Sequence, residues 1–218
     1  AAKDDPEVWR YVDVLSYHWY GRDNQEIMPK IRDFARQGGM DTAQTEFMHL
    51  TVNHLYEDLT IGGVSYWSIY GLGGPGGGGQ NYHFHLNKTS FSRGKQFWNF
   101  RQMIHYVRPE AVRVEAISDD EAIRALASVH HGRTTVILIN NKPPHQARSV
   151  TVTDLPAGSY GVCQSVGTSP YQELGVRSAD AGGGLMFSPS TIRHLTIYPH
   201  PAQNQPPTVT AWQAKPNY

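Results

Sequence analysis

The chain has 218 residues, 39% of them hydrophobic and 11% aromatic, which is enough to bury one or two cores of ordinary domain size. Its 19 Lys and Arg residues balance 19 Asp and Glu residues, so we expect neither nucleic acid nor an anionic membrane as a partner. No apolar run is long enough to span a bilayer, and the first residues form no apolar signal core. Since they also lack an initiator Met, we expect a soluble chain that is either processed or cut. Cys163 is alone, which excludes an intramolecular disulfide.

The first third of the sequence alternates between strand-like and helix-like segments. Strands are predicted at 11–20, 41–47 and 63–70. Helices are predicted between them, from the capping-box spacing of Asp23 and Glu26 to Gly38 and from Met48 to Leu59. This order is typical of consecutive βαβ units, and it predicts a parallel sheet with functional residues at the carboxyl ends of its strands.

The sequence changes character after residue 70. A glycine-rich stretch over 71–79 and the polar and aromatic run that follows it predict a long mobile loop, and a helix ending at Arg108 comes next. From residue 112 onward, short β-rich runs recur at the spacing of an antiparallel sandwich, and strands are predicted at 112–118, 134–140, 149–155, 159–166 and 192–198. We therefore expect a parallel α/β unit over 1–110, an all-β sandwich over 111–200 and a proline-rich linker over 201–218.

Several familiar sites can be set aside. Gly71, Gly73 and Gly76 match the dinucleotide-binding spacing, but more glycine follows them where that motif needs a helix. The pairs His83/His85 and His130/His131 lack an identifiable third ligand, so we predict turn residues for the second pair and no metal or cofactor for the chain. No nucleophile elbow occurs, and Cys163 lies in a predicted sandwich strand, which disfavours covalent serine or cysteine catalysis.

The remaining constellation is a carboxylate among aromatic and polar side chains at strand ends. His18 and Tyr20 end the first predicted strand, Glu46 ends the second and Trp67 lies in the third. Aromatic rings can stack on sugar faces, so a carboxylate among them suits glycosidic chemistry. The alternative is that Glu46 is an ordinary acid at the start of the next helix, where the helix dipole favours it. Composition alone leaves both interpretations open.

Three segments carry a family resemblance: Thr45–Phe47, Leu59–Trp67 and Tyr106–Ala116. They resemble the C-terminal half of a clan A glycoside hydrolase, with family thirty as the nearest match. The resemblance implies an α/β plus all-β fold, in which the last three strands of a (β/α)8 TIM barrel and their helices precede an antiparallel β-sandwich. It also implies that Glu46 is the nucleophile of a retaining mechanism, with His18 or Tyr20 orienting it and Trp67 forming the floor of the sugar subsite. Tyr82, His83 and His85 would line the substrate-binding site.

The same resemblance predicts that something is missing. The acid/base of the family is a glutamate that follows an asparagine on the fourth strand, and this sequence contains no Asn-Glu pair and no first five strands. We therefore predict a secreted or cell-surface β-glycosidase fragment or subunit that acts on a polysaccharide and needs an N-terminal barrel half as its partner. The alternative is a non-catalytic carbohydrate-binding or surface-assembly module derived from such an enzyme.

Overall fold

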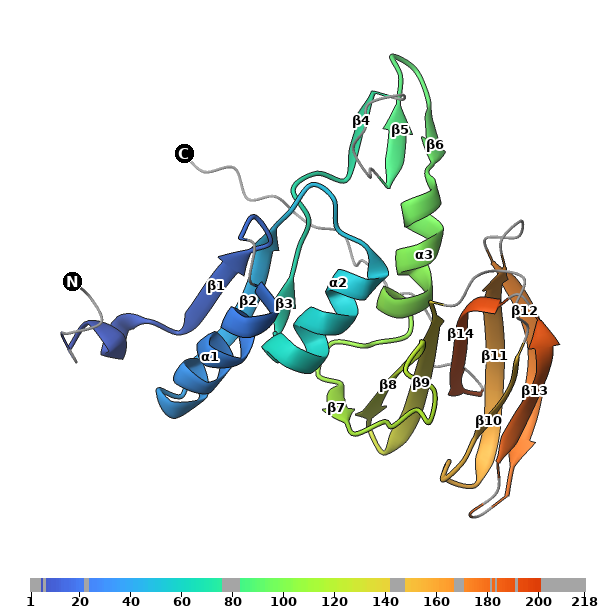
Figure 1. Cartoon of the computed structure of the whole chain (residues 1–218). Helices are drawn as coiled ribbons and strands as arrows, with labels where there is room; N and C mark the ends of the chain where they lie inside the picture. The colour runs from blue at the N-terminus through green and yellow to red at the C-terminus, as the bar shows by residue number, and fades with distance from the viewer. Residues whose placement is uncertain are drawn as a thin grey trace, which may run out of the picture.

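The computed structural model describes residues 5, 7–21, 24–75, 83–141, 148–166, 171–180, 182, 184–190 and 192–200. Within these residues a parallel α/β part comes first and an antiparallel β part follows, with α3 (Lys95–Ile104) between them (Figure 1). The predicted linker over 201–218 lies outside the described residues. None of the described helices is long and apolar enough to cross a bilayer.

The α/β part is built on a three-stranded parallel sheet in the order β1-β2-β3, preceded by a short 3-10 helix, Val8–Tyr11. The strands are β1 (Val14–His18), β2 (Asp41–Glu46) and β3 (Tyr66–Trp67). Helix α1 (Asn24–Gln37) connects the first two strands, and α2 (Val52–Glu57) runs directly into a π-helical turn, Asp58–Gly62, before the third. The predicted alternation of strand and helix is therefore present, although the strands are shorter than their apolar segments.

The segment after β3 differs from the long loop that its glycines predict. It contains a small sheet in the order β4-β5-β6, made of β4 (Gly73–Pro75), β5 (Phe84–Leu86) and β6 (Phe91–Arg93). Phe84 packs against Phe91 and Phe97 at ring-centroid distances of 5.7 and 5.3 Å, which ties this sheet to the start of α3. The prediction of a loop was wrong for these strands because aromatic contacts made across them outweigh the low strand propensity of the sequence.

The antiparallel part contains two sheets. The larger has the order β12-β11-β14-β9-β8-β7 and the smaller pairs β10 with β13. Their bounds are β7 (Val112–Val114), β8 (Ile123–His130), β9 (Arg133–Asn140), β10 (Arg148–Val152), β11 (Gly158–Val166), β12 (Gln172–Ala179), β13 (Leu185–Ser190) and β14 (Ile192–Pro199). Buried side chains from both sheets, among them Val162, Phe187 and Ile197, form one hydrophobic cluster. The two sheets therefore share a core.

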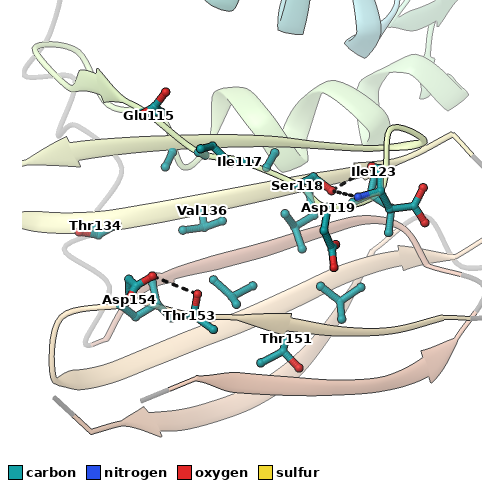
Figure 2. A pocket seen from close by; sticks show the side chains of 18 of the residues that line it. Glu115, Ile117, Ser118, Asp119, Ile123, Thr134, Val136, Thr151, Thr153 and Asp154 are labelled. Atoms are coloured by element: carbon teal, nitrogen blue, oxygen red, sulfur yellow. Dashed lines mark hydrogen bonds between the residues drawn. The ribbon is translucent and has the colours of Figure 1, made fainter. Parts of the chain in front are cut away.

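A pocket of about 1240 Å³ opens at one side of this core (Figure 2). Its walls include the apolar side chains of Ile123, Val136 and Leu138, and acidic residues such as Glu115 and Asp154 also line it. The smaller sheet therefore leaves part of the larger one uncovered.

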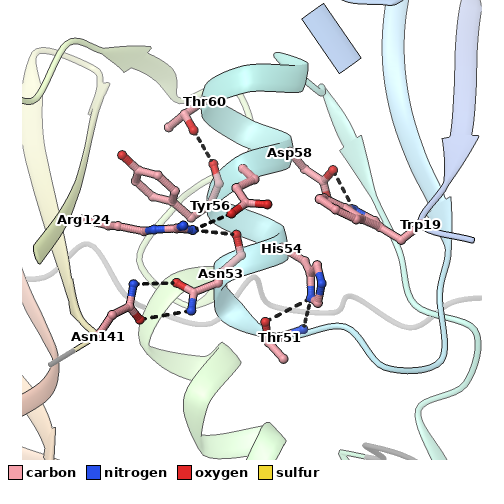
Figure 3. Close-up of polar contacts among 10 residues, drawn as sticks. Trp19, Thr51, Asn53, His54, Tyr56, Asp58, Thr60, Arg124 and Asn141 are labelled. Atoms are coloured by element: carbon pink, nitrogen blue, oxygen red, sulfur yellow. Dashed lines mark hydrogen bonds and ion pairs between the residues drawn. The ribbon is translucent and has the colours of Figure 1, made fainter. Parts of the chain in front are cut away.

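A second hydrophobic cluster joins the two parts of the molecule. Leu55 of α2 and Phe100 and Met103 of α3 pack with Ile137 and Ile139 of β9. Polar contacts reinforce this junction (Figure 3): the Arg124 guanidinium lies 2.8 Å from the Glu57 carboxylate, and the side-chain amides of Asn53 and Asn141 exchange hydrogen bonds of 3.0 and 3.3 Å. The α/β part is therefore packed on the large antiparallel sheet rather than tethered to it.

Candidate active site

Glu46 lies at the carboxyl end of β2, beside the end of β1. The register of these strands pairs Tyr17 with Gln44 and then His18 with Glu46, so that one residue of β2 is bypassed in a bulge. A bulge turns the following side chain toward the other face of a sheet. It therefore sets Glu46 level with His18, a placement that the alternation of side chains along a regular strand would not produce.

Tyr20 contacts the Glu46 carboxylate directly. Its hydroxyl donates a hydrogen bond of 3.0 Å to Oε1 of Glu46, and its ring lies 5.3 Å from that of Phe47 and 5.9 Å from that of His18, both edge-on. Desolvation and then the bond to Glu46 raise the pKa of Tyr20 above its usual value. The phenol therefore stays protonated and remains a donor to the carboxylate at neutral pH.

The two faces of the parallel sheet are different. Tyr17 reaches the π-helical turn at Asp58, so its face is the one covered by the helical segments. Side chains alternate along a strand, which puts Ser16 and His18 on the opposite face, and both are exposed. Tyr66, which is in register with Ala43, belongs to that face as well and is 57% exposed. Glu46 and Tyr20 therefore border an open surface that carries polar and aromatic groups.

Asp58 is a completely buried carboxylate behind this surface, at 0% exposure. It accepts hydrogen bonds from the Tyr17 hydroxyl at 2.7 Å, from the Trp19 indole at 3.0 Å and from the Trp67 indole at 2.9 Å (Figure 3 shows the Trp19 contact). Burial raises the pKa of Asp58 above its usual value, and the three donated hydrogen bonds oppose that rise. The carboxylate therefore joins the ends of β1 and β3 to the π-helical turn.

The sequence analysis did not identify Asp58. Its only signal was that Tyr17, Trp19 and Trp67 each carry a donor that needs a partner when the ring is buried.

His54 fixes the segment that follows Glu46. Its Nδ1 accepts a 2.9 Å hydrogen bond from the Thr51 amide, closing a capping box at the start of α2. The imidazole packs 4.6 Å from the ring of Trp19 and 5.6 Å from that of Phe47. Burial lowers the pKa of His54, so the neutral imidazole that this hydrogen bond requires is favoured.

The other predicted site residues occupy different surroundings. Trp67 is half-buried, and its contacts are with Asp58 and with Phe100, at a ring distance of 5.1 Å. His83 is buried with its ring 4.9 Å from Phe100, and burial lowers its pKa. His85 follows in β5 and is half-buried. Tyr82 lies outside the described residues. The structure therefore brings His18, Tyr20 and Glu46 together and joins Trp67 to His83 through Phe100.

Metal-ligating side chains gather elsewhere in the described part of the chain. Glu110, His130 and His131 form the one group of three there whose ligand atoms lie within 4.8 Å of one another. The pocket between the antiparallel sheets is lined by residues 114 to 156 and includes neither Glu46 nor its neighbours.

Comparisons with known proteins connect this geometry to a fold. Neither the protein-family models nor the curated proteins contain a match to the sequence. Among solved structures, the chain is similar to a glycoside hydrolase family 30 subfamily 8 xylanase from Clostridium acetobutylicum, with a TM-score of 0.72 and 18% identity over 89% of this chain. It is also similar to a family 30 endoxylanase from Clostridium papyrosolvens, with a TM-score of 0.68 and 15% identity over 90% of the chain.

A conserved exported protein from Bacteroides fragilis gives a TM-score of 0.62 at 14% identity over 85% of this chain. The chain spans only 50%, 51% and 45% of these three structures, respectively. It therefore has the fold of about half of each of these proteins.

Proposed function

We propose that the chain is the C-terminal part of a retaining β-glycosidase that acts on a polysaccharide, with Glu46 as its nucleophile. The observation that carries the proposal is the hydrogen-bonded pair of Glu46 and Tyr20 on the uncovered face of a parallel sheet. In enzymes built on parallel barrels, catalytic groups lie at the carboxyl ends of strands, and Glu46 occupies such an end. The likeness to two xylanases makes xylan the first substrate to test.

Each residue has a distinct part in the proposed reaction. The bond from Tyr20 holds Oε1 of Glu46, so that Oε2 can attack the anomeric carbon of the bound sugar. The glycosidic C–O bond breaks as the bond between Oε2 and the anomeric carbon forms, and a separate acid must protonate the departing oxygen. Water then attacks the anomeric carbon of the glycosyl-enzyme, the same group takes its proton, and the Glu46 carboxylate is released. In this proposal His18 contacts the sugar, a role supported by its register with Glu46.

We assign the acid that protonates the departing oxygen to a segment of protein outside these 218 residues. Retaining enzymes hold their two carboxyl groups roughly 5 to 5.5 Å apart, so the acid must come to lie on the open face of the sheet. That face is open to a further layer of protein, because its residues Ser16, His18 and Tyr66 are exposed. We therefore propose that an N-terminal barrel half completes the site and that the complete enzyme is extracellular, where polysaccharides are found.

The test measures reducing ends released from xylan by the chain co-expressed with the segment that supplies the first part of the barrel. Glu46→Gln should lower turnover at least about 10³-fold while keeping xylan binding, because the amide preserves the shape but not the nucleophile. Glu26→Gln, at an exposed glutamate of α1, is the matched control and should keep full activity. Undiminished hydrolysis by Glu46→Gln would remove Glu46 from the mechanism.

A second candidate function is sugar binding without hydrolysis. It is favoured by three exposed tyrosines at the strand ends, Tyr20, Tyr66 and Tyr70, which are 50%, 57% and 57% exposed. Such rings can stack on sugar faces without any acid. Xylan binding by the co-expressed pair with no release of reducing ends would select this alternative.

A further inference from the structure

We propose that Glu110, His130 and His131 form a binding site for a transition-metal cation, Zn²⁺ above all, at the β8–β9 hairpin. Their potential ligand atoms all lie within 4.8 Å of one another, and the imidazole rings of the two histidines are 4.0 Å apart. Glu110 and His131 are exposed and His130 is half-buried, so a cation can reach all three from solvent. This site is independent of the glycosidase function proposed above.

The two histidines are held by a tight hairpin. His130 pairs with Arg133, and the residues between them, His131 and Gly132, have φ values of 48° and 72°. Two central residues with positive φ are the signature of the two-residue turn that best matches the twist of paired strands. Histidine is one of the side chains that tolerates this conformation. The hairpin therefore places both imidazoles before any metal arrives, and little ordering remains to oppose binding.

Strand pairing brings Glu110 to the same place. β7 begins at Val112, which is in register with Val129 on the antiparallel strand β8. The residues just before β7 therefore run beside the residues that end β8. Glu110 has a φ of 67°, so the chain turns at this position as it enters the strand. Residues twenty positions apart in the sequence thus meet at one edge of the large sheet.

The donor set selects the class of ligand. Two imidazoles and one carboxylate are a common protein ligand set for zinc, and the fourth tetrahedral position is left to water or another small ligand. Imidazole also suits Ni²⁺ and Cu²⁺, whereas Mg²⁺ and Ca²⁺ prefer sites made of oxygen. Ligand atoms around zinc are roughly 3.3 Å apart by its bond lengths, so the side chains must close by at most about 1.5 Å from their 4.8 Å limit.

Arg133 follows the hairpin, and its guanidinium donates a 3.3 Å hydrogen bond to the carbonyl of His200, just after β14. That contact keeps the Arg133 guanidinium bonded to the protein backbone. A bound metal would link the turn after α3 to the β8–β9 hairpin, so it should raise the thermal stability of the folded chain.

The experiment titrates tag-free protein with Zn²⁺ alone by calorimetry and with Co²⁺ alone by visible absorption. We expect one site per chain, a tetrahedral Co²⁺ spectrum, and a melting temperature that rises with Zn²⁺. Glu110→Gly and His131→Asn should each weaken binding at least tenfold and abolish the thermal shift. Both new residues tolerate positive φ, so the turns should still fold.

Glu115→Gln and His200→Asn serve as controls, because each removes an exposed side chain of the same type outside the group of three. Both should bind Zn²⁺ like the unmodified chain. Equally tight binding by Glu110→Gly and His131→Asn would overturn the proposal and locate the metal at other histidines, such as His83 and His85. The absence of any heat or Co²⁺ spectrum at millimolar metal would overturn it as well.

Discussion

The parallel sheet and the large antiparallel sheet leave different kinds of surface open. The parallel sheet is covered by helical segments on one face and exposes Ser16, His18 and Tyr66 on the other. The large antiparallel sheet shares a core with its small partner and leaves a pocket with apolar walls at one side. Parallel sheets are almost always covered on both faces. The open polar face is therefore where the proposed N-terminal barrel half would pack.

The two parts nevertheless stabilise one another. The cluster around Phe100 combines side chains of α2, α3, β8 and β9, and Thr196 of β14 donates a 3.0 Å hydrogen bond to the carbonyl of Gln102 in α3. Burial at this junction can hold the parallel sheet in place even while one of its faces is open. Substitutions at Phe100, Asp58 and His54 test that dependence.

Phe100→Ala should have the largest effect, because it removes a 2% exposed ring that contacts Trp67 and His83 at the centre of the junction. Truncating a buried phenylalanine costs about 3–5 kcal/mol through lost burial and the cavity left behind. Urea denaturation followed by circular dichroism measures the change. Phe91→Ala, at a 61% exposed ring, is the control and should cost much less. Equal costs for the two variants would mean that the junction does not stabilise the fold.

Asp58→Ala should destabilise the protein by about 2–4 kcal/mol, because it leaves the Tyr17, Trp19 and Trp67 donors buried without their acceptor. Asp58→Asn keeps one acceptor oxygen and should cost less. The same denaturation experiment measures both variants, with tryptophan fluorescence reporting on Trp19 and Trp67. An unchanged free energy of unfolding in Asp58→Ala would show that these donors find other partners.

The pH dependence at His54 should be the smallest effect. Burial lowers its pKa in the folded state below the usual 6.5, so the neutral imidazole stabilises the fold above that pH. The stabilisation is lost as the pH falls from 6.5 through the lower folded-state pKa. We expect the unmodified chain to lose more of its free energy of unfolding than His54→Asn does when both are compared at pH 7.5 and pH 5.5. Parallel losses would assign the acid sensitivity to other groups.

Much of the architecture follows from local sequence patterns, because β1, β2, α1 and α3 carry the periodicity of their own structure. Three strands of the antiparallel part, at 123–130, 172–179 and 185–190, were not predicted. The first contains Ala125, Leu126 and Ala127, which are good helix formers, and only the neighbouring strands β7 and β9 make the segment extended. Tertiary pairing therefore decided its structure.

The same limit applies to the sites. A carboxylate at the end of a strand could be found in the sequence as Glu46, but the bulge that aligns it with His18 depends on strand pairing. The buried acceptor Asp58 becomes significant only when donors at 17, 19 and 67 converge on it. The third ligand beside His130 and His131 could not be identified from sequence because Glu110 reaches them through the pairing of β7 with the unpredicted β8.

Covalent trapping reveals directly whether Glu46 is the glycosidic nucleophile. A 2-fluoro xylobioside with a dinitrophenol leaving group needs no acid, because that group departs without protonation, and the fluorine slows release of the glycosyl-enzyme. After incubation with the chain and its co-expressed barrel half, peptide mass spectrometry should find one sugar on Glu46 and none on the Glu46→Gln variant. Sugar attached to another carboxylate, or hydrolysis of xylan by a protein that is never labelled at Glu46, would contradict the account.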